Sequence, residues 1–161
     1  MLDDFDRKIL AILQKDSKAP QRRISEAVNL SPSAVNRRIA AMEEAGVIVR
    51  NVAIVDPAKV GRPITVIVEV SVDNERHDLL VEVRNRFTAS PAVAQVYYVT
   101  GDVDFVLVMA VADMTEYEAL TRQLFFSHGN IKRFRTLVVM DSAKVTLEVP
   151  VLGHVRGGAL A

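Results

Sequence analysis

The segment from residue 21 to residue 46, QRRISEAVNLSPSAVNRRIAAMEEAG, constrains the fold of this chain most strongly, because it specifies two short helices separated by a tight turn. The ends of the second helix are well marked. Ser31 can cap its free backbone N–H groups, Pro32 suits its first position, and Gly46 can terminate it. Two helices joined by so short a turn predict a helix-turn-helix motif.

The second helix has one buried and one exposed face. Val35, Ile39 and Met42 recur with helical spacing, so they form a single apolar stripe that packs inward. The opposite face must contact water or a partner. The residues expected on that face and at the start of the helix are Ser31, Ser33, Ala34, Asn36, Arg37 and Arg38.

These side chains have the chemistry needed to read the major groove of double-stranded DNA. Arginine can bond guanine through two hydrogen bonds, asparagine can do the same with adenine, and serine reaches bases or phosphates. Arg22 and Arg23 lie near the start of the preceding helix, where their charge opposes the helix dipole, so phosphate contact explains them better than helix stability does. Periodicity alone is equally compatible with a solvated helix face that binds nothing.

Composition limits the remaining classes of protein. With 161 residues, of which 50% are hydrophobic, the chain suits one or two small folded domains. It contains no cysteine, which excludes disulfides, thiolate zinc sites and cysteine nucleophiles. It has no apolar run of the ~18 residues that span a membrane, and its start, MLDDFDRK, does not resemble a signal peptide. We therefore expect a cytoplasmic protein without membrane partners.

The formal net charge is zero, but the charge is unevenly distributed. Residues 1 to 62 carry eleven basic and eight acidic side chains, whereas residues 63 to 161 carry nine basic and twelve acidic ones. Between Lys18 and Arg38 there are five basic residues and the single acid Glu26. A basic first part joined to an acidic second part fits a regulator built from two modules.

The first module is predicted to span residues 1 to 60. A preceding helix shares its core with the helix pair, and the apolar residues of that helix are Leu2, Phe5, Ile9, Ile12 and Leu13. After Gly46 the β-rich run VIVRNVAIV favours a short strand or wing. The segment from Lys59 to Pro63, with its glycine and proline, is the best candidate for a linker.

Residues 61 to 150 have a different pattern. Apolar runs and amphipathic stretches alternate in the order strand (64–72), helix (75–87), strand (93–99), strand (105–111), helix (114–127) and strand (131–140). This βαββαβ order predicts a ferredoxin-like α+β domain. Helices on one face would leave the Val- and Ile-rich other face of the sheet exposed, so we expect at least a homodimer that covers it. Residues 151 to 161 are expected to form a loose tail or a partner-contacting arm.

Several motifs occur in the order and spacing of a known family. They are LDDFDRKILAILQKDS, NLSPSAVNRRIAAMEEAGVI, YYVTGDVDFVLVM, ADMTEYEAL and FRTLVVM. Over residues 2 to 145 the chain resembles the Lrp/AsnC (leucine-responsive, feast/famine) transcriptional regulators. The resemblance implies a winged helix-turn-helix joined to an amino-acid-sensing domain, in dimers that often associate into octamers. Asn29 replaces a frequent glycine of the family, and asparagine tolerates the left-handed conformation that such a turn uses.

The resemblance also implies an effector pocket between dimers. Its expected residues are Thr100, Gly101, Asp102, Asp104, Phe134, Arg135 and Thr136. Their chemistry suits a zwitterion, because Arg135 and backbone N–H groups of the turn can hold a carboxylate, while Asp102 or Asp104 can hold an ammonium group. Without the resemblance, Thr-Gly-Asp between two apolar strands is an ordinary hairpin turn.

An enzyme of the same two-module architecture is the main alternative, because some relatives resemble haem-pathway decarboxylases. The histidines of this chain are His77, His128 and His154, which are scattered and lack metal-ligand spacing. The sequence also lacks a phosphate-binding loop, a Gly-x-Gly-x-x-Gly run and a nucleophile elbow. We therefore expect no enzymatic activity, no cofactor and no metal. An architectural DNA binder that needs no effector and a ligand-binding oligomer without DNA affinity remain further alternatives.

Overall fold

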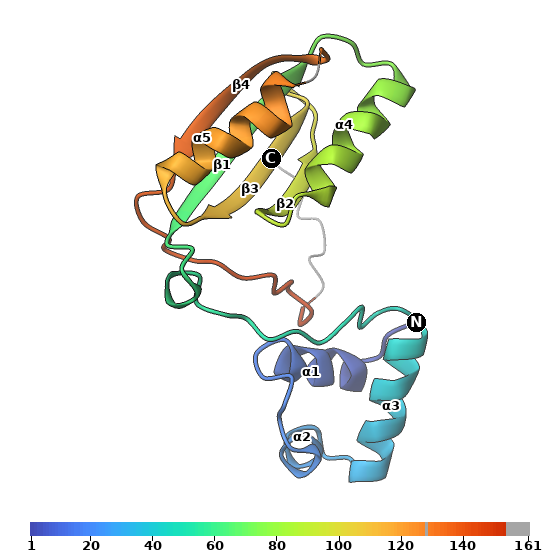
Figure 1. Cartoon of the computed structure of the whole chain (residues 1–161). Helices are drawn as coiled ribbons and strands as arrows, with labels where there is room; N and C mark the ends of the chain where they lie inside the picture. The colour runs from blue at the N-terminus through green and yellow to red at the C-terminus, as the bar shows by residue number, and fades with distance from the viewer. Residues whose placement is uncertain (128, 154–161) are drawn as a thin grey trace, which may run out of the picture. The chain divides into compact units, whose positions relative to one another are not determined.

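A computed structural model of the chain describes residues 1–127 and 129–153 (Figure 1). The chain forms two compact units. The first comprises Met1–Ala53 and the segment that begins at Lys144, and the second comprises Ile54–Ala143. The sequence predicts a boundary near residue 60 instead, because Gly61 and Pro63 mark a linker, whereas the short 3-10 helix Ala58–Val60 (η1) belongs to the second unit.

The first unit contains three helices whose ends are fixed by local residues. They are α1 (Asp4–Leu13), α2 (Gln21–Val28) and α3 (Pro32–Glu44). A capping box begins α1, in which the Asp3 carboxylate accepts from the N–H of Asp6 at 2.9 Å and the Asp6 carboxylate accepts from the N–H of Asp3 at 3.1 Å. The Ser31 hydroxyl caps α3 by accepting from the N–H of Ala34 at 3.2 Å, as the sequence predicts.

The turn between α2 and α3 depends on Asn29. This residue has a φ of 55° and is the one non-glycine position with positive φ among the described residues. Asparagine enters the left-handed region more readily than other non-glycine residues, so it ends α2 where glycine would otherwise be expected. The prediction that the turn persists without glycine is confirmed.

The three helices enclose a small apolar core. Ile9 and Val35 are fully buried, and Ile24 is 1% exposed. The other members of this core are Leu10, Ala19, Val28 and Met42. Ile39 packs against the core while half-buried, so the predicted stripe on α3 faces inward. This packing leaves the opposite face of α3 exposed.

The segment after Lys144 packs on α1. Nε2 of Gln14 donates to the carbonyl of Val149 at 3.0 Å, and Oε1 of Gln14 accepts from the N–H of Val149 at 2.8 Å. Arg7 donates to the carbonyl of Val151 at 3.3 Å, and the Val151 side chain packs against the core of the first unit. The beginning of the expected tail is therefore attached to the first unit, and residues 154–161 of that tail lie outside the described residues.

The β-rich run that follows α3 forms no strand in the described structure. A strand needs a neighbour with which to exchange hydrogen bonds, and none of the four strands within residues 1–127 and 129–153 pairs with this run. Its apolar side chains are instead exposed, Val49 by 84% and Ile54 by 87%. The prediction of a short strand in this run is therefore wrong for the described residues, because the pattern reports β propensity but supplies no pairing partner.

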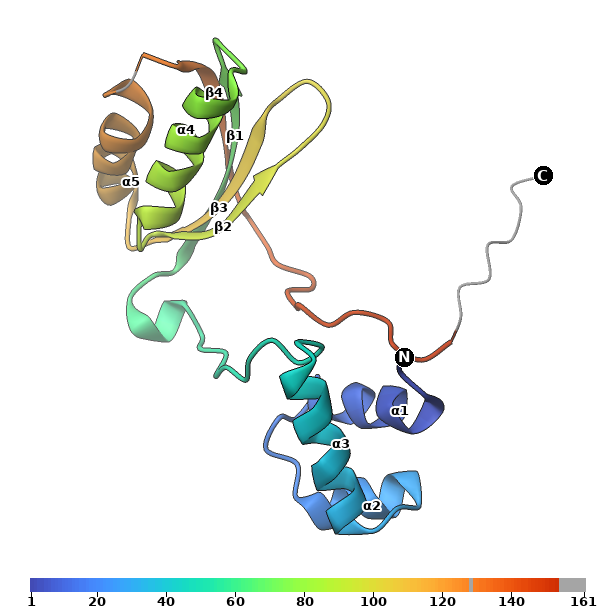
Figure 2. The same cartoon turned by 90° about the vertical axis from the view of Figure 1, so that its right-hand side faces the viewer.

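The second unit is a four-stranded antiparallel sheet with its two long helices on one face (Figure 2). Its elements are β1 (Ile64–Val72), α4 (His77–Ala89), β2 (Val93–Tyr98), β3 (Phe105–Val111), α5 (Met114–Thr121), the π-helical turn η2 (Arg122–Phe126) and β4 (Ile131–Val138). The strand order β2-β3-β1-β4 gives the predicted ferredoxin-like fold. The predicted helix over 114–127 is divided into α5 and η2, and the last strand ends at Val138 rather than at Met140. In the described part of the chain no helix is long and apolar enough to cross a membrane.

The core of the second unit lies between the sheet and the helices. On β1, Val66, Val68 and Val70 are fully buried, because alternate residues of a strand face the same side. Phe87 of α4 packs edge-on against Phe105 of β3, with ring centroids 5.6 Å apart. These contacts fix the start of β3, and with it the hairpin between β2 and β3.

The other face of the sheet, which we call the open face, is covered by neither α4 nor α5 (Figure 2). The pairing register places Ile67 opposite Val108 on one side and opposite Leu137 on the other. Leu137 is 41% exposed and Tyr97, on β2, is 48% exposed. The open face therefore presents apolar side chains at its centre.

Candidate functional sites

The start of α3 gathers five of the residues that the sequence assigns to DNA. Ser33, Asn36 and Arg37 are exposed, and Ala34 is half-buried between them and the core. The hydroxyl of Ser31 is 3.1 Å from that of Ser33 while it caps the helix. The structure therefore brings one arginine, one asparagine and two hydroxyl groups to a single exposed helix surface.

Arg38 is the exception, because its side chain turns toward α1. Its guanidinium lies 2.8 Å from the carboxylate of Asp3 and 2.7 Å from that of Asp6. It also lies 5.5 Å from the ring centre of Phe5, within reach of a cation–π contact. Hydrogen bonds to the two carboxylates raise the pKa of Arg38, and the N–H of Asp6 together with Arg38 lowers the pKa of Asp3. The helical wheel assigns Arg38 to the flank of the exposed face, but its ion pairs attach α3 to α1.

Arg22 and Arg23 lie at the start of α2 in exposed ion pairs. Arg22 is 2.8 Å from Glu26 with its side chain 88% exposed, and Arg23 is 3.4 Å from Asp16 with its side chain 69% exposed. Ion pairs at such exposure contribute little to stability. Both guanidinium groups can therefore exchange these carboxylates for phosphate oxygens.

Sequence reasoning missed Gln21, which connects the two helices of the motif. Gln21 is the first residue of α2, and its Nε2 donates a hydrogen bond to Oδ1 of Asn36 on α3. The contact arises from the way the two helices pack. No periodicity or local motif in the sequence identifies it.

The hairpin between β2 and β3 contains four of the expected effector residues. Thr100, Gly101 and Asp102 are exposed, and Gly101 has a φ of 121° that favours glycine. Asp104 differs from them, because its carboxylate accepts a hydrogen bond from the N–H of Val72 at 2.8 Å. The Asp104 carboxylate is therefore already hydrogen-bonded to the last residue of β1.

The three expected effector residues on β4 alternate between the two faces of the sheet. Phe134 packs on the helix side, 4.6 Å from the ring centre of Phe125, and the Thr136 hydroxyl lies 2.5 Å from the hydroxyl of Tyr117. Burial raises the pKa of Tyr117. Phe134 and Thr136 therefore face the core of the second unit.

Arg135 lies on the open face, where it pairs with Glu69 of β1 at 2.6 Å. This hydrogen-bonded pair lowers the pKa of Glu69 and raises that of Arg135. The turn around Gly101 joins β2 to β3, and β1 lies between β3 and β4 in the strand order, so Arg135 and this turn belong to strands that do not pair with each other.

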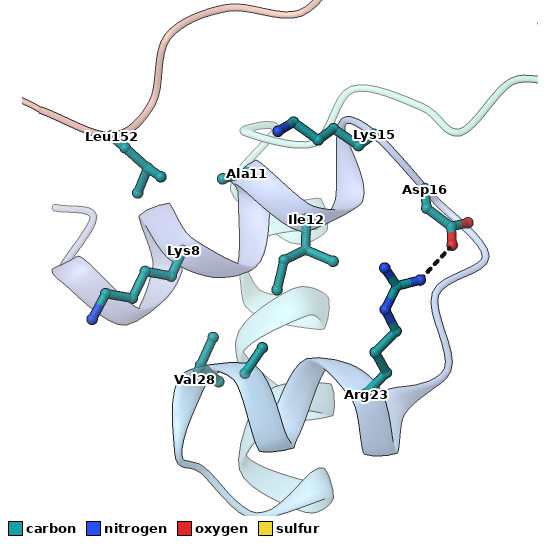
Figure 3. Close-up of a pocket in the computed structure, with 9 residues that line it drawn as sticks. Lys8, Ala11, Ile12, Lys15, Asp16, Arg23, Val28 and Leu152 are labelled. Atoms are coloured by element: carbon teal, nitrogen blue, oxygen red, sulfur yellow. Dashed lines mark hydrogen bonds and ion pairs between the residues drawn. The ribbon is translucent and has the colours of Figure 1, made fainter.

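Two surface hollows accompany these sites. The first, of about 320 Å³, lies on the first unit beside α1 and α2, and Leu152 of the C-terminal segment forms part of its wall (Figure 3). The second, of about 180 Å³, lies beside the β2–β3 hairpin and is lined by His77, Leu80, Val81, Arg84, Tyr98 and Phe105. None of the expected effector residues lines it.

Of the three histidines, His77 is exposed at the start of α4, whereas His128 and His154 lie outside the described residues. Within residues 1–127 and 129–153 no group of three or more His, Asp or Glu side chains could hold a metal ion.

Comparison with known proteins identifies both units. Residues 2–49 match the winged helix-turn-helix DNA-binding family, and residues 65–149 match the Lrp/AsnC ligand-binding domain. An HTH-type transcriptional regulator of Sinorhizobium fredii is 41% identical to this chain over 150 residues, which cover 93% of this chain and 89% of that protein.

Two solved structures are similar over nearly their whole length. An AsnC family transcriptional regulator from Agrobacterium tumefaciens has a TM-score of 0.88 and 35% identity, covering 93% of this chain and 97% of that one. A transcriptional regulator from Neisseria meningitidis in complex with L-Met has a TM-score of 0.88 and 26% identity, covering 94% of this chain and 98% of that one. The relatives are transcriptional regulators and not enzymes, so the decarboxylase alternative is not supported. With its DNA-binding unit and its ligand-binding unit, the chain belongs to the Lrp/AsnC family of transcriptional regulators.

Proposed function

We propose that this regulator reads specific DNA sequences with α3 of paired subunits, and that a small effector, an amino acid or a related molecule, alters how the subunits hold DNA. The observation that carries the first part is the exposed start of α3, where Ser33, Asn36 and Arg37 face solvent together. Arginine forms paired hydrogen bonds with guanine in the major groove, and asparagine also hydrogen-bonds base edges there. Arg22 and Arg23, exposed at the start of α2, then bond phosphates.

The proposed effector carries an amino group and a carboxylate. The similar regulator from Neisseria meningitidis was solved with L-Met, which supports an amino acid here. The exposed hairpin residue Asp102 can hold an ammonium group, and Arg135 can hold a carboxylate if it exchanges Glu69 for the effector. Because β1 lies between the strand that carries Arg135 and the hairpin that carries Asp102, a second subunit is proposed to complete the pocket.

We further infer that the protein is a homodimer that associates into octamers. Two apolar surfaces support subunit pairing: the open face of the sheet, with Ile67 and Leu137, and the exposed run that includes Val49 and Ile54. The second surface has strong β propensity, and residues 49–55 make no backbone hydrogen bond to another described residue, so it can pair with its counterpart in another copy. A twofold dimer would place two recognition helices on successive half-sites of a near-palindromic DNA site.

Two arginine variants test the DNA assignment. Arg37→Ala should weaken binding to the preferred site by about 1–3 kcal/mol and relax base preference at one position, because a base contact is lost. Arg22→Ala should weaken binding to all sequences alike and reduce the salt slope by about one, because a phosphate contact is lost. The measurement is titration of DNA fragments at several salt concentrations. Equal losses on specific and random DNA for Arg37→Ala would contradict its role as a base reader.

A thermal-shift screen against the twenty amino acids tests the effector assignment. A ligand that binds only the native protein raises its melting temperature as the ligand concentration exceeds Kd. We expect a selective shift that Asp102→Ala or Arg135→Ala removes while DNA binding persists. Asp104→Ala is a poor test, because it would leave the N–H of Val72 without its acceptor. The absence of any shift would contradict an amino-acid effector and favour an architectural DNA binder.

A further inference from the structure

The side-chain amide of Asn36 is hydrogen-bonded to the side-chain amide of Gln21. Nε2 of Gln21 donates to Oδ1 of Asn36, so the oxygen of Asn36 is turned back toward α2. Asn36 itself is exposed on the face of α3 that the proposed function assigns to base reading. The contact therefore determines which end of the asparagine amide is available to DNA.

The oxygen of the Gln21 amide gives a second reason to think that Gln21 orients Asn36. Oε1 of Gln21 is buried and has no hydrogen-bond partner among the described residues. A buried acceptor without a donor lowers stability, so stabilisation of the fold does not explain why a glutamine occupies this position. Orientation of Asn36 does explain it, since the hydrogen bond from Gln21 to α3 comes from the nitrogen of its amide.

The donor and acceptor pattern of the pair then limits which bases suit Asn36. With Oδ1 already accepting from Gln21, the group presented outward is Nδ2, which carries two N–H donors. Its partners in the major groove are acceptors, namely N7 and O6 of guanine, N7 of adenine and O4 of thymine. An unrestrained asparagine would instead use both its oxygen and its nitrogen on adenine.

We propose that Gln21 is a positioning residue that sets the base preference of Asn36 toward acceptor edges without contacting a base itself. This inference rests on the proposed function of α3 in reading DNA. It assigns a specificity role to a side chain on α2, outside the recognition helix.

Two substitutions of Gln21 give opposite expectations. Glutamate at this position offers only acceptors, so in Gln21→Glu the Asn36 nitrogen must turn inward and its oxygen outward, which shifts preference toward the exocyclic amines of adenine and cytosine. In Gln21→Leu the hydrogen bond is lost at similar side-chain size, so preference at that one base pair should relax by about fivefold or more. The measurement is binding of the full-length protein, at fixed salt, to its preferred site and to every single-base variant of that site.

Matched controls separate orientation from charge and folding. Ala27→Glu adds the same charge to an exposed position of α2 and should weaken binding to all sequences equally. In an Asn36→Ala background, Gln21→Glu and Gln21→Leu should leave base preference unchanged, because no asparagine remains to be oriented. Thermal unfolding of each variant checks that the first unit stays folded.

The outcomes distinguish the two proposals. If the parent protein shows base preference and both Gln21 variants keep it at every position, or lose affinity uniformly, Gln21 does not orient a base reader and this inference is wrong. If the parent protein itself shows no base preference, the proposed function of α3 fails, and this inference fails with it. If Gln21→Glu or Gln21→Leu still shifts base preference in the Asn36→Ala background, this inference is also wrong.

Discussion

Arg37 and Arg38 are adjacent in the sequence but lie in opposite surroundings. Successive residues of a helix point about 100° apart, so one arginine faces solvent while the next reaches α1. Arg38 interacts with Asp3, Asp6 and Phe5, whereas Arg37 is exposed on the surface proposed to read DNA. Two residues of one type therefore have different expected roles, one in packing and one in recognition.

Arg38→Gln should lower the melting temperature of the protein and leave base preference unchanged. The variant removes the charge that pairs with Asp3 and Asp6 and leaves those two carboxylates close together without a cation. Thermal unfolding and DNA titration of the same preparation measure both effects. Arg37→Gln is the matched control, with the reverse pattern expected. Lost base preference at an unchanged melting temperature in Arg38→Gln would show that this arginine reads DNA after all.

At the scale of elements, local signals predict most of the fold. The cap at Ser31, the left-handed Asn29 and the strand over residues 64–72 depend on neighbours in the sequence, and the structure matches each prediction. The candidate sites are less predictable, because the pairing of Asp104 with the N–H of Val72 is set by tertiary packing. The same limit explains why sequence reasoning missed Gln21 and why it predicted a strand after Gly46 that has no pairing partner.

The C-terminal segment is an element whose attachment no local pattern indicates. Gln14 bonds both backbone groups of Val149, so Gln14→Ala should destabilise the first unit by about 1 kcal/mol and loosen the segment. Chemical denaturation and limited proteolysis between Lys144 and Val151 measure the two effects. Gln123→Ala, an exposed position on η2, is the control that should change neither. Unaltered proteolysis in Gln14→Ala would mean that this contact does not hold the segment.

At the scale of the whole molecule, two exposed apolar surfaces favour assembly with further copies of this chain. They are the open face of the sheet and the run that includes Val49 and Ile54. Leu137 lies on the open face with its side chain partly exposed, opposite Ile67. Leu137→Lys should weaken subunit association by about tenfold or more, since a charge in an apolar interface costs more than the roughly 1.4 kcal/mol that corresponds to that factor.

Sedimentation across a range of protein concentrations measures this association. Met114→Lys is the control, because Met114 is similarly exposed, by 45%, at the start of α5 and away from the open face. An equal effect of both variants, or of neither, would exclude the open face as the interface.

The most direct test of sequence-specific DNA reading is selection of bound fragments from a random pool of double-stranded DNA by the purified full-length protein at fixed salt. We expect enrichment of a near-palindromic motif with two half-sites about one helical turn, roughly 10 base pairs, or a multiple of that distance apart. We also expect Arg37→Ala to lose the preference at one position of each half-site. A recovered pool with no enriched sequence would contradict sequence-specific recognition, because it would show that the exposed face of α3 binds DNA without reading it, or does not bind DNA at all.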